Sequence, residues 1–547
     1  MSLYLSDPLM PQIKQVSIQS MDHLGLVAAL LKKYKIAQRI DLMLPIKLDK
    51  RTKSTYGQRI CALILNGLGF TNATLYMTPD FFKDKPIEAL IAPGLCADDM
   101  NEDALGRCLD KLNQHGTTRL FSQLAFEIIQ EHGLLSTSHH LDSTSLALFG
   151  EYNGDWKHAP IPKQGYSKDH RPDLKQVVVN LITNGPAGLP IYYESYDGNA
   201  ADKTIFHDSI AYMRNFIEEL NNSEDMLWVA DSALYNTNKL QNANVNWLTR
   251  VPATLNIVKQ NSAKSDDAFE WCELDNGYRY AKINDEDKDS PNENWVLYSS
   301  EQGKARQLKT LEKKIDNAHQ ALTRALKKVS GTLYACEHDA RQALKNTAKK
   351  AKYHQVVERE IEAQWGYEKR GRPKPEDKKL KGYRVIADIV ENAEAIAQAK
   401  HPLGRFVLAT NKTSLTPAQM LKEYKQQSQV ENGFRFMKDK SFQSNRIYLQ
   451  NPQRIDALLM VMSLSLLVYN LGQYELRARL TKEDETLPNQ LGHPTQSPTL
   501  RWVFQMLRGI SYVDLGTQGI GVANISEREE KIIRLFGKEA LDIYQLS

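Results

Sequence analysis

The sequence predicts an α/β protein whose mixed sheet is interrupted by a large insertion. Three observations support this fold class. Stretches with the alternation or the Val and Ile content of β-strands follow one another closely at 138–149, 175–183 and 189–193. Two further short strands, 226–230 and 246–249, alternate with helical stretches. Another strand, at 406–410, resumes the pattern only after residues 251–405 and leads directly into a helix.

Each predicted strand has its own signature. In the first, His140, Asp142, Thr144 and Leu146 alternate onto one side. The second, KQVVVNLIT, is dense enough in Val and Ile to be a central strand, and an Asn-Gly turn leads into the third. Helices are expected at 201–220 and 237–243. The order βββαβαβ matches the ribonuclease-H-like architecture, a fold that does not by itself give a function.

The rest of the chain predicts four further regions around this core. Residues 1–132 have helical periodicity, and both a DNA-binding or dimerising role and a plain packing role are open for them. The insertion combines strand-like stretches with two basic helices, 302–328 and 337–350. The expected order is a helical N-terminal domain (1–132), the first part of the core (133–250), the insertion (251–405), the closing strand and helix of the core (406–445) and C-terminal helices (446–547).

Composition limits the class of protein further. Charged residues make up 25% of the 547 and hydrophobic residues 41%, which is typical of a globular protein. The net charge is only +4, yet residues 302–353 carry 13 Lys or Arg against 4 Asp or Glu, which favours an anionic polymer as partner. Five cysteines without a C-x-x-C pair favour a reducing cytosol. The longest apolar run, 457–468, contains two serines and is too short for a bilayer, so a buried helix and no membrane contact are expected.

The stretch 421–440, LKEYKQQSQVENGFRFMKDK, is predicted to be one helix. Thr416 suits its N-cap, and Pro417 and Gln419 suit the positions that follow. At about 100° per residue, its polar side chains at spacings of three, four and seven share an arc of about 60°. Those side chains are Tyr424, Gln427, Glu431 and Lys438, with Arg435 beside the arc. A solvated helix face is the alternative interpretation.

Two further carboxylates are expected close to Glu431. Asp142 lies on the first strand and Asp231 directly after the fourth. These strands are neighbours in a ribonuclease-H-like sheet, so both carboxylates meet at one edge. Three converging carboxylates favour Mg²⁺, with Mn²⁺ as the second choice. Taken singly, Asp142 is open to a hydrogen-bonding role and Asp231 to capping of the next helix.

Several segments of the chain resemble the DDE transposases of bacterial insertion sequences. They are HLDSTSL, GYSKDHRPDLKQ, WVADSALYN and YKQQSQVENGFRFMKDK, together with NGLGF at 66–70. The most similar branch carries a Tyr–Arg–Glu–Lys signature, which corresponds here to Tyr424, Gln427, Glu431 and Lys438. Gln427 therefore stands where that branch has Arg, and a charged phosphate contact from this position is in doubt.

The resemblance implies a chemistry and a set of partners. Asp142, Asp231 and Glu431 would hold the metal ions during DNA strand cleavage, hairpin formation and strand transfer. Double-stranded DNA at terminal inverted repeats and target DNA would be the substrates of a homodimer on paired ends, in the cytoplasm and nucleoid of a bacterium. Tyr424, Gln427, Arg435 and Lys438 would contact this DNA.

Basic loops add further candidate DNA contacts. Lys168 and Arg171 lie between the first two strands and are expected to meet phosphates, although a structural loop is the alternative. Arg370 and Arg372 have the form of an AT-hook core, and a plain basic loop is the alternative. Two rival functions remain open: a ribonuclease-H-like structure-specific nuclease, and a catalytically inactive or domesticated DNA-binding protein.

Overall fold

The computed structural model divides the chain into two compact units, Met1–Leu248 with Lys422–Ser547, and Thr249–Leu421. Each unit is a body of its own and is described separately. The residues that the structure describes are 2–3, 16–50, 52–71, 74–153, 159–168, 171–219, 225–235, 245–283, 292–367, 374, 376, 378–439, 442, 449–516 and 519–546.

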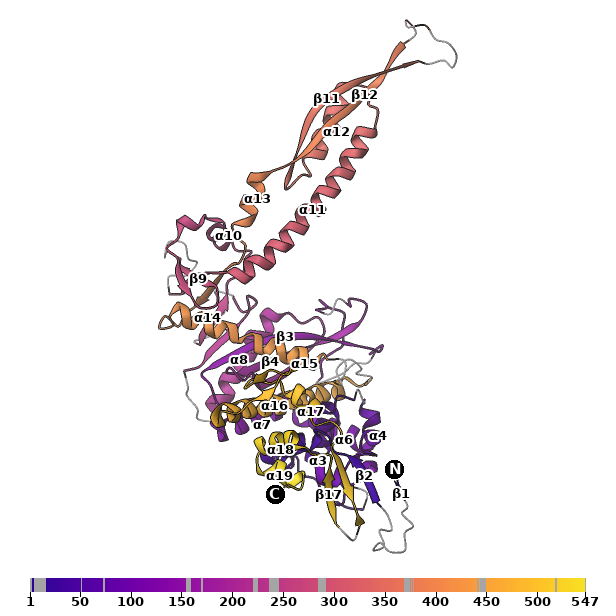
Figure 1. Cartoon of the computed structure of the whole chain (residues 1–547), viewed down its shortest axis with the longest axis vertical. Coiled ribbons are helices and arrows are strands. Elements are labelled where there is room, and N and C mark those ends of the chain that lie inside the picture. Colours follow the sequence, from indigo (N-terminus) through magenta and orange to yellow (C-terminus); the bar gives the residue numbers. More distant parts are fainter. Residues whose placement is uncertain are drawn as a thin grey trace. The chain divides into compact units, whose positions relative to one another are not determined.

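The first unit contains the predicted sheet (Figure 1). Its strands run in the order β5-β4-β3-β6-β7. β3 and β4 pair antiparallel, as do β4 and β5, whereas β3 and β6 are parallel. This order confirms the predicted α/β class with a ribonuclease-H-like core, while the helix expected at 237–243 lies outside the described residues. The strands are β3 (Ser138–Leu148), β4 (Lys175–Asn184), β5 (Leu189–Tyr196), β6 (Leu227–Ala230) and β7 (Asn246–Arg250).

Helix α16 (Pro452–Glu483) is the apolar centre of this unit. It packs against β5, as does α7 (Thr117–Glu131). It is long and apolar enough to cross a membrane, but 94% of its most apolar window is buried inside the protein, as in a core helix. Ser463 and Ser465 are satisfied because their hydroxyls donate to backbone carbonyls one turn earlier, each at 3.0 Å. The expectation of a buried helix at 457–468 is confirmed, within a helix longer than that run.

The N-terminal region contributes a bundle of helices and two strands, β1 and β2, that its sequence did not predict. Strand β2 (Val16–Ser20) pairs antiparallel with β16 (Ser511–Asp514) in a sheet ordered β1-β2-β16-β17. The expectation of a purely helical region is therefore wrong at β2, because its partner lies almost the whole chain away. The helices are α1 (Leu24–Lys33), α2 (Ile36–Met43), α3 (Tyr56–Leu68), α4 (Thr78–Phe82), α5 (Ile87–Leu90), α6 (Glu102–His115) and α7.

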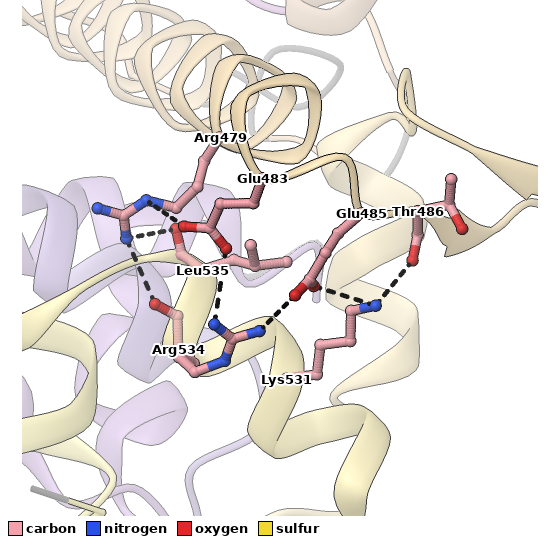
Figure 2. Close-up of polar contacts among 7 residues, drawn as sticks. All are labelled: Arg479, Glu483, Glu485, Thr486, Lys531, Arg534 and Leu535. Carbon is pink, nitrogen blue, oxygen red and sulfur yellow. Dashed lines mark hydrogen bonds and ion pairs between the residues drawn. The ribbon is translucent and has the colours of Figure 1, made fainter.

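The C-terminal elements close against the end of α16 through ion pairs (Figure 2). Arg534 of α18 reaches Glu485 at 2.8 Å and Glu483 at 3.6 Å, and Lys531 reaches Glu485 at 3.1 Å. These side chains are partly exposed to solvent, so the ion pairs add little to the stability of the fold. The remaining elements of this unit are α8 (Asp202–Glu219), β1 (Ser2–Leu3), β14 (Leu487–Pro488), β15 (Pro494–Thr495), α17 (Leu500–Met506), β17 (Ile520–Ala523), α18 (Glu527–Leu535) and α19 (Lys538–Ile543).

The second unit begins with strands that lie in the order β13-β10-β9-β8. Arg405 at the start of β13 is 8% exposed, and its guanidinium lies 5.6 Å from the Phe269 ring centroid and 5.5 Å from that of Trp271. It also donates to the Ser262 carbonyl at 2.9 Å and pairs with Asp266. The elements are α10 (Asn256–Ala263), β8 (Cys272–Leu274), β9 (Tyr278–Lys282), β10 (Asn294–Ser300), α13 (Ala393–Lys400) and β13 (Arg405–Thr410).

The basic part of the second unit has a core of its own. The predicted basic helices are confirmed as α11 (Glu301–Gly331) and α12 (Glu337–Ala348), and they pack on a two-stranded ribbon of β11 (His354–Tyr367) and β12 (Lys378–Glu391) (Figure 1). Leu326, Ala340, Leu344 and Val385 are buried at its centre. β11 was not predicted, because its glutamates mask the alternation of a strand with one covered face. The expected loop 369–381 gives way to β12 from Lys378 onward, and most of the rest lies outside the described residues.

Candidate active site

Asp142 lies in the middle of the first unit's sheet. Its strand, β3, is flanked by β4 and β6, and Asp142 stands opposite Leu181 of β4. One carboxylate oxygen accepts a hydrogen bond from the Ser143 amide at 2.8 Å. Burial raises the pKa of Asp142 to about 7, a rise that the charges of Asp231 and Glu431 reinforce and that Lys168 and the Ser143 amide oppose. The three predicted carboxylates are therefore close enough to interact electrostatically.

Asp231 follows β6 at the point where that strand leaves the sheet. Leu141 of β3 is in parallel register with Ala230, so Asp142 and Asp231 are the next residues on the two strands. The Asp231 side chain is exposed and accepts a hydrogen bond from the Ala233 amide at 2.9 Å, which shapes the turn after β6. The parallel pairing thus brings the two aspartates to the same level of the sheet.

The predicted helix 421–440 is two helices. The capping box at its start is present: the Thr416 amide donates to the Gln419 side chain at 2.9 Å, and the Gln419 amide donates to the Thr416 hydroxyl at 3.3 Å. The first helix, α14, spans Pro417–Gln426, and the second, α15 (Ser428–Met437), starts after Gln427. The expectation of a single helix is wrong at Gln427, where the backbone bonds tighten from four-residue to three-residue spacing. Glu431 then lies exposed in the first turn of α15.

Asp142 and Glu431 share one open pocket of about 550 Å³. Both carboxylates face it together with three cations from the predicted DNA-contact set: Lys168, Arg435 and Lys438. Lys168 is held there because its ammonium donates to the Ser143 carbonyl at 2.6 Å. The full lining is Asp142, Ser143, Thr144, Lys168, Glu431, Phe434, Arg435, Lys438 and Asp439.

The three carboxylates are suitable ligands for a divalent cation, but they would have to move closer together to bind one. Hard carboxylate oxygens are the ligands that Mg²⁺ and Mn²⁺ prefer. Burial is the main cause of the raised pKa of Asp142, and the charges of Asp231 and Glu431 add to it; a cation between the carboxylates would relieve that repulsion. Within the described ranges, no three Asp, Glu, His or Cys side chains stand close enough together to hold an ion as they are. Asp142, Asp231 and Glu431 would hold it by moving together.

The other predicted DNA-contact residues lie in different surroundings. Tyr424 is partly buried, and Arg171 is exposed and makes a bidentate pair with Asp173 at 2.8 and 2.7 Å. The side chain of Gln427 is 6% exposed and its amide donates to the Leu141 carbonyl at 2.5 Å, so its expected DNA contact stays a prediction that would need this side chain to leave the sheet. Arg370 and Arg372 lie outside the described residues.

One wall of the pocket contains a pair that the sequence did not predict. Asp439, next to Lys438, pairs with Arg501, whose guanidinium lies 4.7 Å from the ring centroid of Phe70. Phe70 ends the NGLGF segment with a positive φ of 52°, and its ring contacts that of Phe436 at 5.9 Å. The N-terminal segment therefore supports the end of α15. Only the presence of NGLGF among the resembling segments signalled its importance.

The ribonuclease-H-like sheet carries a pocket in which carboxylates lie beside Lys and Arg side chains. Such a site defines a class of protein that acts on an anionic substrate. The chain belongs to the family described as "Transposase DDE domain", which matches residues 141–471. It is thus a DNA transposase by class, an enzyme class that cleaves and joins DNA and generally uses divalent metal ions.

The other comparisons are less specific. Residues 16–126 match a family described as a domain of unknown function, DUF4277. No curated protein matches the chain. Among solved structures, a cryo-EM structure of the piggyBac transposase synaptic complex with hairpin DNA aligns with 89% of this chain and 80% of that one, at 10% identity and a TM-score of 0.36.

Proposed function

We propose that this protein cleaves and joins the ends of a bacterial insertion sequence, with Asp142, Asp231 and Glu431 as ligands of two Mg²⁺ ions, or Mn²⁺ in their place. The observation that carries the proposal is the pocket in which Asp142 of the central strand meets Glu431 of α15. Asp231 joins them through the parallel register of β3 and β6. When bound, such ions activate a water or a 3′-hydroxyl and stabilise the leaving oxygen of a phosphodiester.

The surrounding cations suit a polyanionic substrate. Lys168, Arg435 and Lys438 border the carboxylates, so a phosphodiester that enters the pocket meets positive charge on the loop side and on the helix side. Such contacts position a DNA backbone without reading its bases. The DNA would be the terminal inverted repeats and then the target, held by a dimer on paired ends.

We assign the second half of the reaction to the face of α14 and α15. Tyr424 lies on α14, and Lys438 directly follows α15, the helix that carries Glu431; from there the two side chains would hold the end of the DNA after the first nick. In this scheme the freed 3′-hydroxyl attacks the opposite strand and closes a hairpin. The hairpin is then reopened and joined to target DNA.

The test is metal-dependent cleavage of DNA that carries the inverted repeats flanking the coding sequence. Asp142→Asn, Asp231→Asn and Glu431→Gln should each lower the nicking rate by more than about a hundredfold, since loss of a residue that merely supports a ligand already costs about 10- to 100-fold. Binding to the end should persist. Asp98→Asn, which neutralises an exposed carboxylate remote from the pocket in sequence, is the matched control and should cleave normally.

The products separate the rival functions. A transposase joins a pre-cleaved end to target DNA, whereas a structure-specific nuclease stops at cleavage. A DNA-binding protein without catalysis would bind ends and leave them intact. Near wild-type nicking by Asp231→Asn would show that the carboxylates are wrongly assigned.

A further inference from the structure

At the junction between α14 and α15, the side chain of Gln427 is turned toward the sheet, away from the face that carries Glu431. At Gln427 the backbone amide bonds to the Tyr424 carbonyl at 3.1 Å, and its own carbonyl accepts from Val430 at 3.2 Å. Both bonds span three residues, while the four-residue bond from Glu431 is long, at 3.5 Å. Such a tightened turn shifts the angular position of a side chain relative to a regular helix. Gln427 consequently faces the sheet, although Glu431, one turn later, is exposed.

The Gln427 amide makes its hydrogen bond to the strand that carries Asp142. Its Nε2 donates to the Leu141 carbonyl at 2.5 Å, and Gln427 is only 6% exposed. His140, on the same strand, is completely buried. Water therefore has little access to this hydrogen bond and does not readily replace the amide as donor. The bond links Leu141, the residue before Asp142, to Gln427, four residues before Glu431.

The Leu141 carbonyl, which accepts this hydrogen bond, lies on the side of β3 where β6 ends. The Thr137 carbonyl accepts from the Leu227 amide at the start of β6, at 2.7 Å. Carbonyls alternate along a strand, so the Leu141 carbonyl, four residues later, points to the same side of β3. Leu141 pairs there with Ala230, the last residue of β6 and the neighbour of Asp231. The Gln427 amide thus bonds to the backbone at Leu141, directly beside both Asp142 and Asp231.

We propose that Gln427 is a positioning residue that sets the separation between Glu431 and the two aspartates, and that it does so from inside the protein without touching DNA. The inference rests on the proposed function, because it assumes that these carboxylates bind divalent ions together. It is specific to the amide: an apolar side chain of equal length would fill the space but could not bond to Leu141. A shorter amide could bond only if the helix moved toward the strand.

Two substitutions separate the hydrogen bond from packing and polarity. Gln427→Met keeps the length and loses the donor, and Gln427→Asn keeps the amide and loses one methylene. Gln429→Met is the matched control two residues later, in α15, where Gln429 lies near Gly188. Asp142→Asn defines the background. The measurements are Mn²⁺ binding by electron paramagnetic resonance, the Mg²⁺ concentration for half-maximal nicking, and affinity for end DNA without metal.

We expect both Gln427 variants to bind Mn²⁺ at the Asp142-dependent site about 10- to 100-fold more weakly, the usual effect of losing a residue that supports a ligand. The Mg²⁺ requirement should rise in parallel, and end affinity should stay within about twofold, as expected of a side chain that meets no phosphate. The melting temperature of each variant, compared with Gln429→Met, reports on folding. If one variant is unfolded, the other carries the test.

The opposite results are distinct. Unchanged Mn²⁺ affinity with weakened end binding would make Gln427 a DNA ligand, and no change in any measurement would make it a filler; either overturns the inference. Wild-type protein that binds Mn²⁺ through Asp142 but cuts no end DNA would refute the proposed function and leave the Mn²⁺ comparison valid. Wild-type protein without Asp142-dependent Mn²⁺ binding would overturn both.

Discussion

The structure predicts that His23 makes the first unit sensitive to acid. The His23 ring stacks on Phe504 at a centroid distance of 4.4 Å, and its Nε2 donates to the Leu68 carbonyl at 2.8 Å. Burial lowers the pKa of His23 to about 4. The Leu68 bond and the Asp22 charge oppose this shift, and the charges of Arg508 and Lys85 add to it.

The sign of the effect follows from proton linkage. An unfolded chain binds a proton at His23 near its ordinary pKa of about 6.5, whereas the folded protein binds one only near 4. Stability from neutral His23 is therefore fully present above about pH 6.5 and is lost as the pH falls toward about 4. A shift of this size corresponds to a loss of about 2 kcal/mol between about pH 7 and about pH 5.

The assay is urea unfolding of wild type and His23→Gln at both pH values. Gln can still donate to Leu68 but does not titrate, so the difference between the two proteins isolates this one group from all other titrations. We expect wild type to lose about 2 kcal/mol more than His23→Gln on acidification. If the two proteins lose stability in parallel, the ring is not buried as a neutral imidazole and the reasoning fails.

Four further predictions concern DNA and the second unit. Tyr424→Ala and Lys438→Ala should impair conversion of pre-nicked ends into hairpins more than the first nick, measured on denaturing gels; hairpin yields equal to wild type would make this face structural. Lys313→Gln and Lys314→Gln on exposed positions of α11 should each reduce the salt slope of DNA binding by about one if they meet phosphates, in titrations at several salt concentrations. In the same titrations, the double variant Arg370→Ala, Arg372→Ala should weaken binding to A·T-rich ends selectively if the loop is an AT-hook. It should weaken binding to all DNA alike if the loop is a plain basic loop, and unchanged affinity and salt slope would exclude a role in holding DNA. Arg405→Met should destabilise the second unit by about 3 kcal/mol or more, measured by thermal unfolding, because it leaves buried carbonyl groups unpaired; a change under about 0.5 kcal/mol would show that Phe269 and Trp271 do not depend on it.

Local pattern was enough to determine the core of this protein. Alternation and β-branched residues located β3, β4 and β5, and their order with the following strands already specified the ribonuclease-H-like sheet. The same order predicts Asp142 on one strand and Asp231 directly after its neighbour, as the pairing of β3 with β6 shows. These features depend on side-chain periodicity and chain order, which a sequence states directly. The assignment of the three carboxylates as metal ligands stays a prediction.

Tertiary packing alone decided the rest. A period of about 100° predicts Gln427 on one polar face with Glu431, yet the helix tightens there and the side chain is buried against Leu141. β2 pairs with β16 from the opposite end of the chain, and β11 is a strand because its one covered face packs on α12. In each case the deciding contact joins residues that are distant in sequence or depends on which face another element covers. Periodicity carries no information about such partners, so only the folded chain could show that Gln427 belongs to the interior of the site.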